Sequence, residues 1–160
     1  MKDHISVQGT YILLLQCNHE AELSIGKPGK MKTEPGYYLY VGSAFGPGGI
    51  QARVNHHMQI AERPHWHIDY LRTVVVLVNV WCVYGSRYEH EWARGLLQSD
   101  AAKVPLKGFG SSDCDCTTHL FYFEHKPTKA ALEKLLNNRL ATIEVYHPDF
   151  SQRRRARRGF

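Results

Sequence analysis

Three stretches rich in β-branched and aromatic residues predict the strands of a sheet, at residues 7–16, 37–41 and 73–84. In the first stretch, Tyr11, Leu13 and Leu15 share one face and Thr10, Ile12 and Leu14 share the other, so both faces are mostly apolar. We therefore expect a central strand that is covered on both sides and pairs antiparallel with the second strand. A short apolar run at 120–123 favours a fourth strand at the edge of the sheet. Segment 17–35, interrupted by glycines and prolines, is predicted as a connecting excursion with room for one short strand.

A helix is predicted after the glycine-rich turn of residues 42–49. At about 100° per residue, one apolar stripe contains Ile50, Val54, Met58 and Ala61. Arg53 and His57 lie on one edge of this stripe, facing back toward the tyrosine-rich second strand, whereas His56 points away. A cation and an imidazole at the rim of a core are typical of a functional site, although a helix edge with an extended arginine has the same pattern.

Three further helices complete the predicted fold. A short one is expected at residues 65–72. A second, at 86–98, turns four residues inward: Trp92, Ala93, Leu96 and Leu97. A third, at 128–141, has Thr128 as its N-cap and an apolar stripe of Leu132, Leu135, Leu136 and Leu140. The fold class is therefore α/β (α+β), a single domain over residues 1–146 with a central three-stranded antiparallel sheet flanked by helices.

Several short motifs in this order resemble the GIY-YIG nuclease superfamily. They are Gly9-Thr10-Tyr11, Tyr40-Val41-Gly42, Arg53, His57 and Glu89. Thr10 and Val41 stand where the superfamily usually has isoleucine, and both keep the β-branched shape. The most similar group is a small branch, long without an assigned function, that is found alone or appended to endonuclease III. That resemblance includes residues 65–70 and 108–123.

The resemblance implies a GIY-YIG-like fold and a metal-dependent DNA endonuclease, with a place in DNA repair or processing. It implies that Tyr11 activates the attacking water and that Tyr40 helps to hold the phosphate and the water. It also places a metal-binding glutamate, here Glu89, at the start of the helix predicted for residues 86–98. The alternative hypothesis is that the domain binds nucleic acid without cleaving it.

The residues themselves support parts of this assignment. A phenol has a pKa near 10, so Tyr11 needs a neighbouring cation or base to act at neutral pH, and Arg53 and His57 are available. The Arg53 guanidinium can fork onto phosphate oxygens. Glu89 lies on the apolar side of its helix, opposite Glu91, where an unpaired carboxylate is costly.

Two roles for Glu89 remain open at this point. It can hold Mg²⁺ or Mn²⁺, since Mg²⁺ keeps several waters and one protein carboxylate is enough. Alternatively, Ser86 and Glu89 can form a capping box at the start of the helix. The expected substrate-binding residues are Gly42, Ser43, His65 and His67; His65 lies one helical turn from Asp69, which can orient an imidazole.

A second group of metal-binding residue types lies in the loop before residue 120. Cys114, Cys116 and His119 offer three ligands, and Cys82 is a candidate for the fourth of a structural zinc site. Two free thiols in such a loop are the simpler interpretation. If zinc is bound, a zinc-stabilised interaction domain becomes a third functional class.

Composition and charge add limited constraints. The 160 residues have a formal net charge of +5, and five of the arginines fall in the last eight residues, so the rest of the chain is close to neutral. We expect residues 147–160 to form a basic, disordered tail that adds salt-sensitive attraction to DNA. Four cysteines are too few for a secreted disulfide framework, and no apolar run is long enough to span a membrane. A cytoplasmic protein is predicted.

Overall fold

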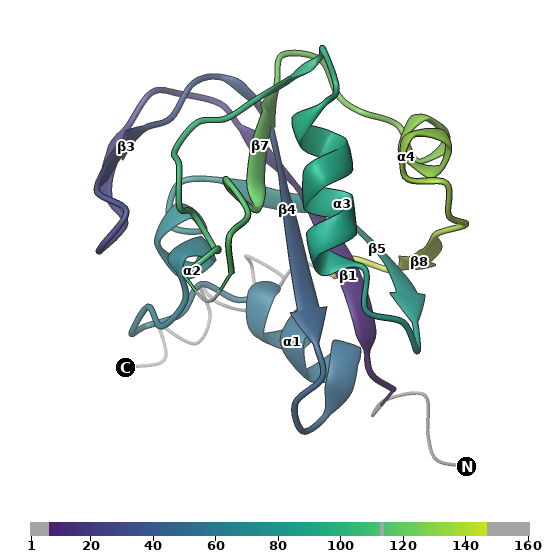
Figure 1. The fold of residues 1–160 in the computed structure, drawn as a ribbon. Helices are drawn as coiled ribbons and strands as arrows, with labels where there is room; N and C mark the ends of the chain where they lie inside the picture. Colours follow the sequence, from purple (N-terminus) through teal and green to yellow (C-terminus); the bar gives the residue numbers. More distant parts are fainter. Residues whose placement is uncertain (1–6, 113, 147–160) are drawn as a thin grey trace.

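The computed structural model describes residues 7–112 and 114–146, and these form a mixed α+β domain (Figure 1). The strands are β1 (Gly9–Cys17), β2 (Glu22–Ser24), β3 (Lys30–Lys32), β4 (Gly36–Ala44), β5 (Val76–Tyr84), β6 (Ala102–Lys103), β7 (Leu120–Phe123) and β8 (Ala141–Ile143). The helices are α1 (Gly49–His57), α2 (His67–Leu71), α3 (Glu89–Leu97) and α4 (Lys129–Leu136). The basic segment 147–160 lies outside the described residues.

The main sheet has six strands rather than the three predicted, in the order β6-β7-β4-β1-β5-β8. The three predicted strands lie next to one another as β4, β1 and β5, and every neighbouring pair in the sheet is antiparallel. The strand at 120–123 is present as β7, but it is not at the edge, because the two-residue β6 pairs with its outer side. The excursion after β1 contains two short strands, β2 and β3, which pair with each other as a separate sheet.

The predicted burial of β1 on both faces is confirmed. On one face Tyr11, Leu13 and Leu15 pack into a core with residues of α1 and α2. On the other face Ile12 and Leu14 pack into a second core with residues of α3 and α4. Because successive side chains of a strand point to opposite faces, β1 contributes residues to two cores, one on each side of the sheet.

The helices are shorter than predicted, and three apolar residues lie elsewhere than expected. α1 ends at His57, so Ala61 is beyond its stripe. Leu97 and Leu135 are 42% and 40% exposed, because α3 and α4 each turn only part of the predicted stripe toward the sheet. α4 ends at Leu136, where Asn137 adopts a left-handed conformation (φ 54°) that ends helices. Thr128 is confirmed as the N-cap of α4, since its hydroxyl accepts a hydrogen bond from the N–H of Ala131.

Within residues 7–112 and 114–146, no helix is long and apolar enough to cross a membrane.

Candidate functional site

The candidate site lies where β4 runs past the end of β7. The two strands pair only from Tyr37 to Tyr40, and the last contact on this side is the N–H of Val41, which donates to the carbonyl of His119. Beyond it, the edge of β4 at Ser43 faces a cavity instead of a strand. α1 reaches this edge from one face of the sheet, and the start of α3 reaches it from the other.

Two adjoining cavities form the site. One, of about 220 Å³, is lined by Tyr40, Ser43, Arg53, Trp66, Glu89, His90, Gly110, Cys114 and His119. The other, of about 160 Å³, is lined by Tyr40, His65, Trp66, His67, Gly110 and Ser112. Tyr40, Trp66 and Gly110 belong to both. Of the nine residues predicted for catalysis or substrate binding, six line this joint cavity: Tyr40, Ser43, Arg53, His65, His67 and Glu89.

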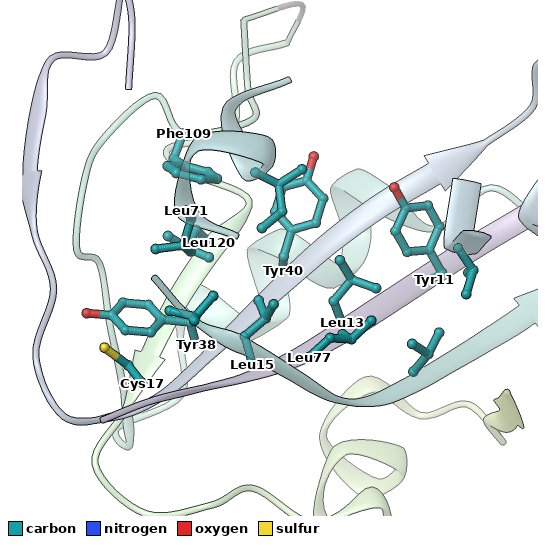
Figure 2. Packing of buried hydrophobic residues seen from close by; sticks show 14 of the residues in the cluster. Tyr11, Leu13, Leu15, Cys17, Tyr38, Tyr40, Leu71, Leu77, Phe109 and Leu120 are labelled. Atoms are coloured by element: carbon teal, nitrogen blue, oxygen red, sulfur yellow. The ribbon is translucent and has the colours of Figure 1, made fainter. Parts of the chain in front are cut away.

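The remaining catalytic candidates, Tyr11 and His57, lie behind the cavity. Each is only 1% exposed, and the Tyr11 hydroxyl lies 2.8 Å from Nε2 of His57 in a buried hydrogen bond. Figure 2 shows the hydroxyls of Tyr11 and Tyr40, on neighbouring strands, pointing to the same side of the sheet. His57, which the pattern placed at a helix edge, is therefore a core residue held against the tyrosine pair.

Gly42 is the residue that makes room for Tyr11. It lies directly opposite Tyr11 in the β1–β4 register. A Cβ at this position would meet Cζ and the hydroxyl oxygen of Tyr11 at 2.4 Å, closer than real side chains approach. The glycine thus lets the phenol ring lie flat across β4, which gives Gly42 a positioning role beside the substrate-binding role predicted for it.

Burial keeps this cluster uncharged. It raises the pKa of Tyr11 to about 12, although the neighbouring Arg53 opposes the rise. It also raises the pKa of Tyr40 well above the ordinary value, with the Tyr11 phenol adding to the effect. Burial, followed by the nearby His56, lowers the pKa of His57 to about 3. At neutral pH, His57 is therefore a neutral imidazole that can accept a hydrogen bond.

Arg53 is held over the cavity by two contacts. Its Nη1 donates to the carbonyl of Ser43 at 3.1 Å, and its guanidinium carbon lies 4.3 Å from the ring centre of Trp66. The second contact has the geometry of a cation–π interaction. Arg53 is partly exposed, so it presents a fixed cation to the cavity. Trp66 was not predicted as a site residue.

Asp69 organises the loop that carries Trp66, but not in the way predicted. Its Oδ2 accepts hydrogen bonds from the N–H groups of His65 and Trp66, at 2.8 and 3.0 Å. Its Oδ1 lies 2.8 Å from Nε2 of His56. The predicted pairing of Asp69 with the His65 imidazole is wrong, and His56 does not simply point away. Burial raises the pKa of Asp69, but these bonds outweigh it and lower the pKa overall.

His67 fixes the opposite wall of the cavity. Its Nδ1 accepts a hydrogen bond from the N–H of Gly110 at 2.8 Å. Gly110 has a φ of +73°, and a Cβ there would lie 3.0 Å from Cε1 of Tyr40. The loop before β7 thus passes tightly over Tyr40, and His67 anchors it.

Glu89 is placed by a buried hydroxyl on β1. Thr10 donates to the carbonyl of Ser86 at 2.8 Å and accepts from the N–H of Tyr88 at 2.9 Å, which fixes the start of α3. The capping box, the alternative role for Glu89, is not formed: the N-cap is Tyr88, without a side-chain cap, because the helix begins at Glu89 itself. The Glu89 side chain is thereby free of the helix start and reaches the cavity with 19% of its surface exposed.

Two groups near Glu89 keep it ionised. Burial raises its pKa, but His119 and the Ser43 hydroxyl outweigh this and lower the pKa overall. The closest contact is Oε2 of Glu89 with Nδ1 of His119, at 3.1 Å. The two atoms are close but not aligned as a hydrogen bond, and Nδ1 is buried without a bonded partner. Glu89 therefore offers a carboxylate oxygen that can hold a metal ion.

The thiol loop gathers a different set of ligands from the one predicted. Cys114, Cys116 and His119 lie together with His90, and their ligand atoms are all within 4.8 Å of one another. Cys82, the expected fourth ligand, instead lies fully buried in the core, opposite Tyr11 on the neighbouring strand. All four cysteines are free thiols. Burial and the neighbouring Cys114 raise the pKa of Cys116 to about 11.

Fold and site together define a small α+β domain with a polar cleft lined by tyrosine, arginine and glutamate. The chain belongs to a family described as a domain of unknown function, DUF123, whose match covers residues 10–141. No curated protein and no solved structure matches the chain.

Proposed function

We propose that this domain is a metal-dependent DNA endonuclease of the GIY-YIG type, which hydrolyses a phosphodiester bond. The observation that carries the proposal is the Tyr11–His57 hydrogen bond beside Arg53, at the back of a cavity that also contains Tyr40 and Glu89. These are the residue types that phosphodiester hydrolysis needs: a proton acceptor, a fixed cation and a metal-binding carboxylate.

The Tyr11–His57 pair supplies the general base. With a pKa of about 12, the Tyr11 phenol keeps its proton at neutral pH, so it is a weak base on its own. With a pKa of about 3, His57 is too weak a base to take the phenol proton, so its neutral Nε2 accepts the hydrogen bond of the phenol and orients the Tyr11 oxygen. Tyr11 would take a proton from water once the charge of Arg53 and of a bound metal ion lowers its pKa. Tyr11 is not a cavity-lining residue, so this role requires that substrate binding opens a path for water to the phenol oxygen.

Arg53, Tyr40 and Glu89 bind the phosphodiester. Arg53 offers its guanidinium to the non-bridging oxygens, where negative charge develops during attack. Tyr40 donates its hydroxyl to the same group from the cavity wall. Glu89 would hold Mg²⁺ or Mn²⁺, and the ion would supply positive charge to the phosphate and to the leaving oxygen. Ser43, His65 and His67 line the path of the flanking nucleic-acid backbone.

The second candidate function is a nucleic-acid-binding module without cleavage. The burial of Tyr11 favours it, since a phenol that water cannot reach does no chemistry. The same cation, the polar histidines and Tyr40 would then bind a phosphate backbone without breaking it.

A cleavage assay separates the two functions. Purified protein is incubated with supercoiled plasmid, single-stranded DNA and branched DNA, with Mg²⁺, with Mn²⁺ or with EDTA. We expect metal-dependent nicking that Glu89→Ala abolishes. Glu91→Ala is the matched control, because Glu91 is an exposed carboxylate on the same helix and should keep full activity. If the parent cuts no substrate above the level of folded Glu89→Ala, the domain is a binding module.

A further inference from the structure

We propose that His90, Cys114, Cys116 and His119 form a four-ligand zinc site, distinct from the site proposed for Mg²⁺ or Mn²⁺ at Glu89. Zinc binding can be tested whether or not the domain is a nuclease. The four come from two parts of the chain: His90 from the first turn of α3, and the other three from the loop that leads into β7. Two thiolates and two imidazoles are a set that selects zinc over the oxygen-preferring Mg²⁺.

The distances are those of a nearly assembled tetrahedral site. Sγ of Cys114 lies 3.5 Å from Nε2 of His119. In a tetrahedral site with ordinary Zn–S and Zn–N bonds, these atoms would be about 3.6 Å apart. The widest separation within the group is 4.8 Å or less, so the remaining ligands need to move inward by roughly 1 Å. The rings of His90 and His119 are already close, with centroids 5.9 Å apart.

His119 has the surroundings of a metal ligand on its other side as well. A metal-binding histidine commonly presents its second ring N–H to a carboxylate, which fixes the tautomer and orients the ring. In this structure Nε2 faces Cys114, and Nδ1 is buried 3.1 Å from Oε2 of Glu89 without an aligned hydrogen bond. Zinc at Nε2 would put the proton on Nδ1, opposite that carboxylate.

The backbone around His119 is already fixed. Its N–H donates to the carbonyl of Phe109 at 2.8 Å, and its own carbonyl accepts from Val41 on β4 at 3.0 Å. The two cysteines lie in the more open part of the loop, beside a cavity of about 240 Å³ that His90 also lines. A zinc ion here would join α3 to the loop. Because four protein ligands close the coordination sphere, its role would be to hold the loop that passes over Tyr40.

The site also shares a wall with the candidate active site. His90 and Cys114 line the cavity that contains Arg53 and Glu89. Glu89 thus faces the cavity with part of its carboxylate and supports His119 with Oε2. Zinc binding would thereby fix the position of the carboxylate that the proposed nuclease uses.

Zinc binding can be measured without DNA. Protein purified without a histidine tag and kept reduced is analysed for metal content, both as isolated and after loading with zinc. We expect about one equivalent of tightly bound zinc. Replacement by Co²⁺ should give the visible absorption of a tetrahedral site with sulfur-to-metal charge transfer. A folded parent with less than roughly a tenth of an equivalent after loading overturns the proposal.

Variants test which residues bind the metal. His90→Ala and Cys116→Ala should each weaken zinc affinity, measured by competition with a chromophoric chelator, by more than about tenfold. Glu89→Gln should weaken it by roughly 10- to 100-fold, as expected for a residue that orients a ligand. The exposed His125 and the buried Cys82 provide controls, and His125→Ala and Cys82→Ala should bind as the parent does. Parent-like affinity in folded His90→Ala, or its loss in folded Cys82→Ala, contradicts the assigned ligand set.

Discussion

Arg53 and Val54 are adjacent on α1, yet they face different surroundings. Arg53 contacts Trp66 and the carbonyl of Ser43 at the cavity, whereas Val54 is fully buried in the core. Arg53→Ala removes one hydrogen bond and one cation–π contact, so it should lower the free energy of unfolding by about 1–2 kcal/mol. The cleavage rate should fall by about 10²–10³-fold, because a donor to the developing charge is lost.

Val54→Ala is the comparison for that experiment. It should cost about 2 kcal/mol, through two lost methyl groups and the cavity they leave. The melting temperature should drop by about 4–8 °C, while the protein that remains folded stays active. Both variants are measured by thermal melting and by initial rate at one salt concentration. An Arg53→Ala protein that folds and cuts at the parent's rate would show that the proposed active site is wrong.

The buried His57 predicts how stability depends on pH. Its pKa is lowered from 6.5 to about 3 in the folded state. Between these values the unfolded chain binds a proton that the folded state does not, so stability is lost as the pH falls. His57→Gln should remove this contribution, and the slope of unfolding free energy against pH should decrease by up to about 1.4 kcal/mol per pH unit.

The slope is measured by urea unfolding at several pH values between 3 and 6.5, the two pKa values of His57. Comparing slopes rather than stabilities separates the protonation effect from the packing that the variant also loses. Parallel curves for parent and variant would mean that folding does not lower the pKa of His57. The buried, neutral imidazole assigned beside Tyr11 would then be wrong.

At the scale of elements, the register between β1 and β4 places the tyrosine pair. Gly42→Ala would put a Cβ 2.4 Å from the Tyr11 ring, so either the ring or the strand must shift. We expect destabilisation of about 1–3 kcal/mol, as in other overpacked cores, together with loss of cleavage. Gly46→Ala in the following turn is the control, because a Cβ there meets nothing within 4 Å. Thermal melting and initial rates should distinguish the two. Equal behaviour would show that Gly42 does not hold Tyr11 in place.

The centre of the sheet was predictable because its strands have strong local patterns. β1, β4 and β5 are each nine residues long and mostly apolar, and they pair as neighbours. The outer strands have no comparable signal. β6 has two residues and β8 has three, so pairing with β7 and β5 defines them rather than any periodicity. Thr10 indicates one contact between elements, since a buried hydroxyl in an apolar strand needs a hydrogen-bond partner, and here the partner is the segment that starts α3.

The candidate site was predictable where a residue's chemistry implied its role, and not where a distant partner decided it. Arg53 and Glu89 reach the cavity as expected. The sequence did not point to Trp66 or to His90, because a cation–π contact and the proposed fourth zinc ligand are defined only by the arrangement in space. Cys82 was the natural fourth ligand by residue type, but its position on β5 places it in the core.

At the scale of the whole molecule, the placement of charge bears on the proposed binding of DNA. The formal net charge is +5, and Arg153, Arg154, Arg155, Arg157 and Arg158 account for all of this excess. The elements of the fold and the candidate site lie within residues 7–146. If the domain acts on DNA as proposed, the basic segment would supply the attraction to the polyanion and the cavity would supply the chemistry. Affinity and catalytic rate should therefore be separable by shortening the chain.

Removing residues 152–160 should weaken DNA binding strongly at low salt and hardly at all at high salt. Each phosphate contact contributes about 0.9 to the slope of log affinity against log salt on duplex DNA, so losing five arginines should reduce that slope by up to about 4.5. The melting temperature and the cleavage rate at saturating DNA should stay at the parent's values. Binding is measured by fluorescence anisotropy over a salt series, and replacing the five arginines with lysine serves as the control, because it keeps the charge. If the shortened protein has the parent's salt slope, DNA is held by the domain itself, and Arg53 and its neighbours supply the electrostatic contacts.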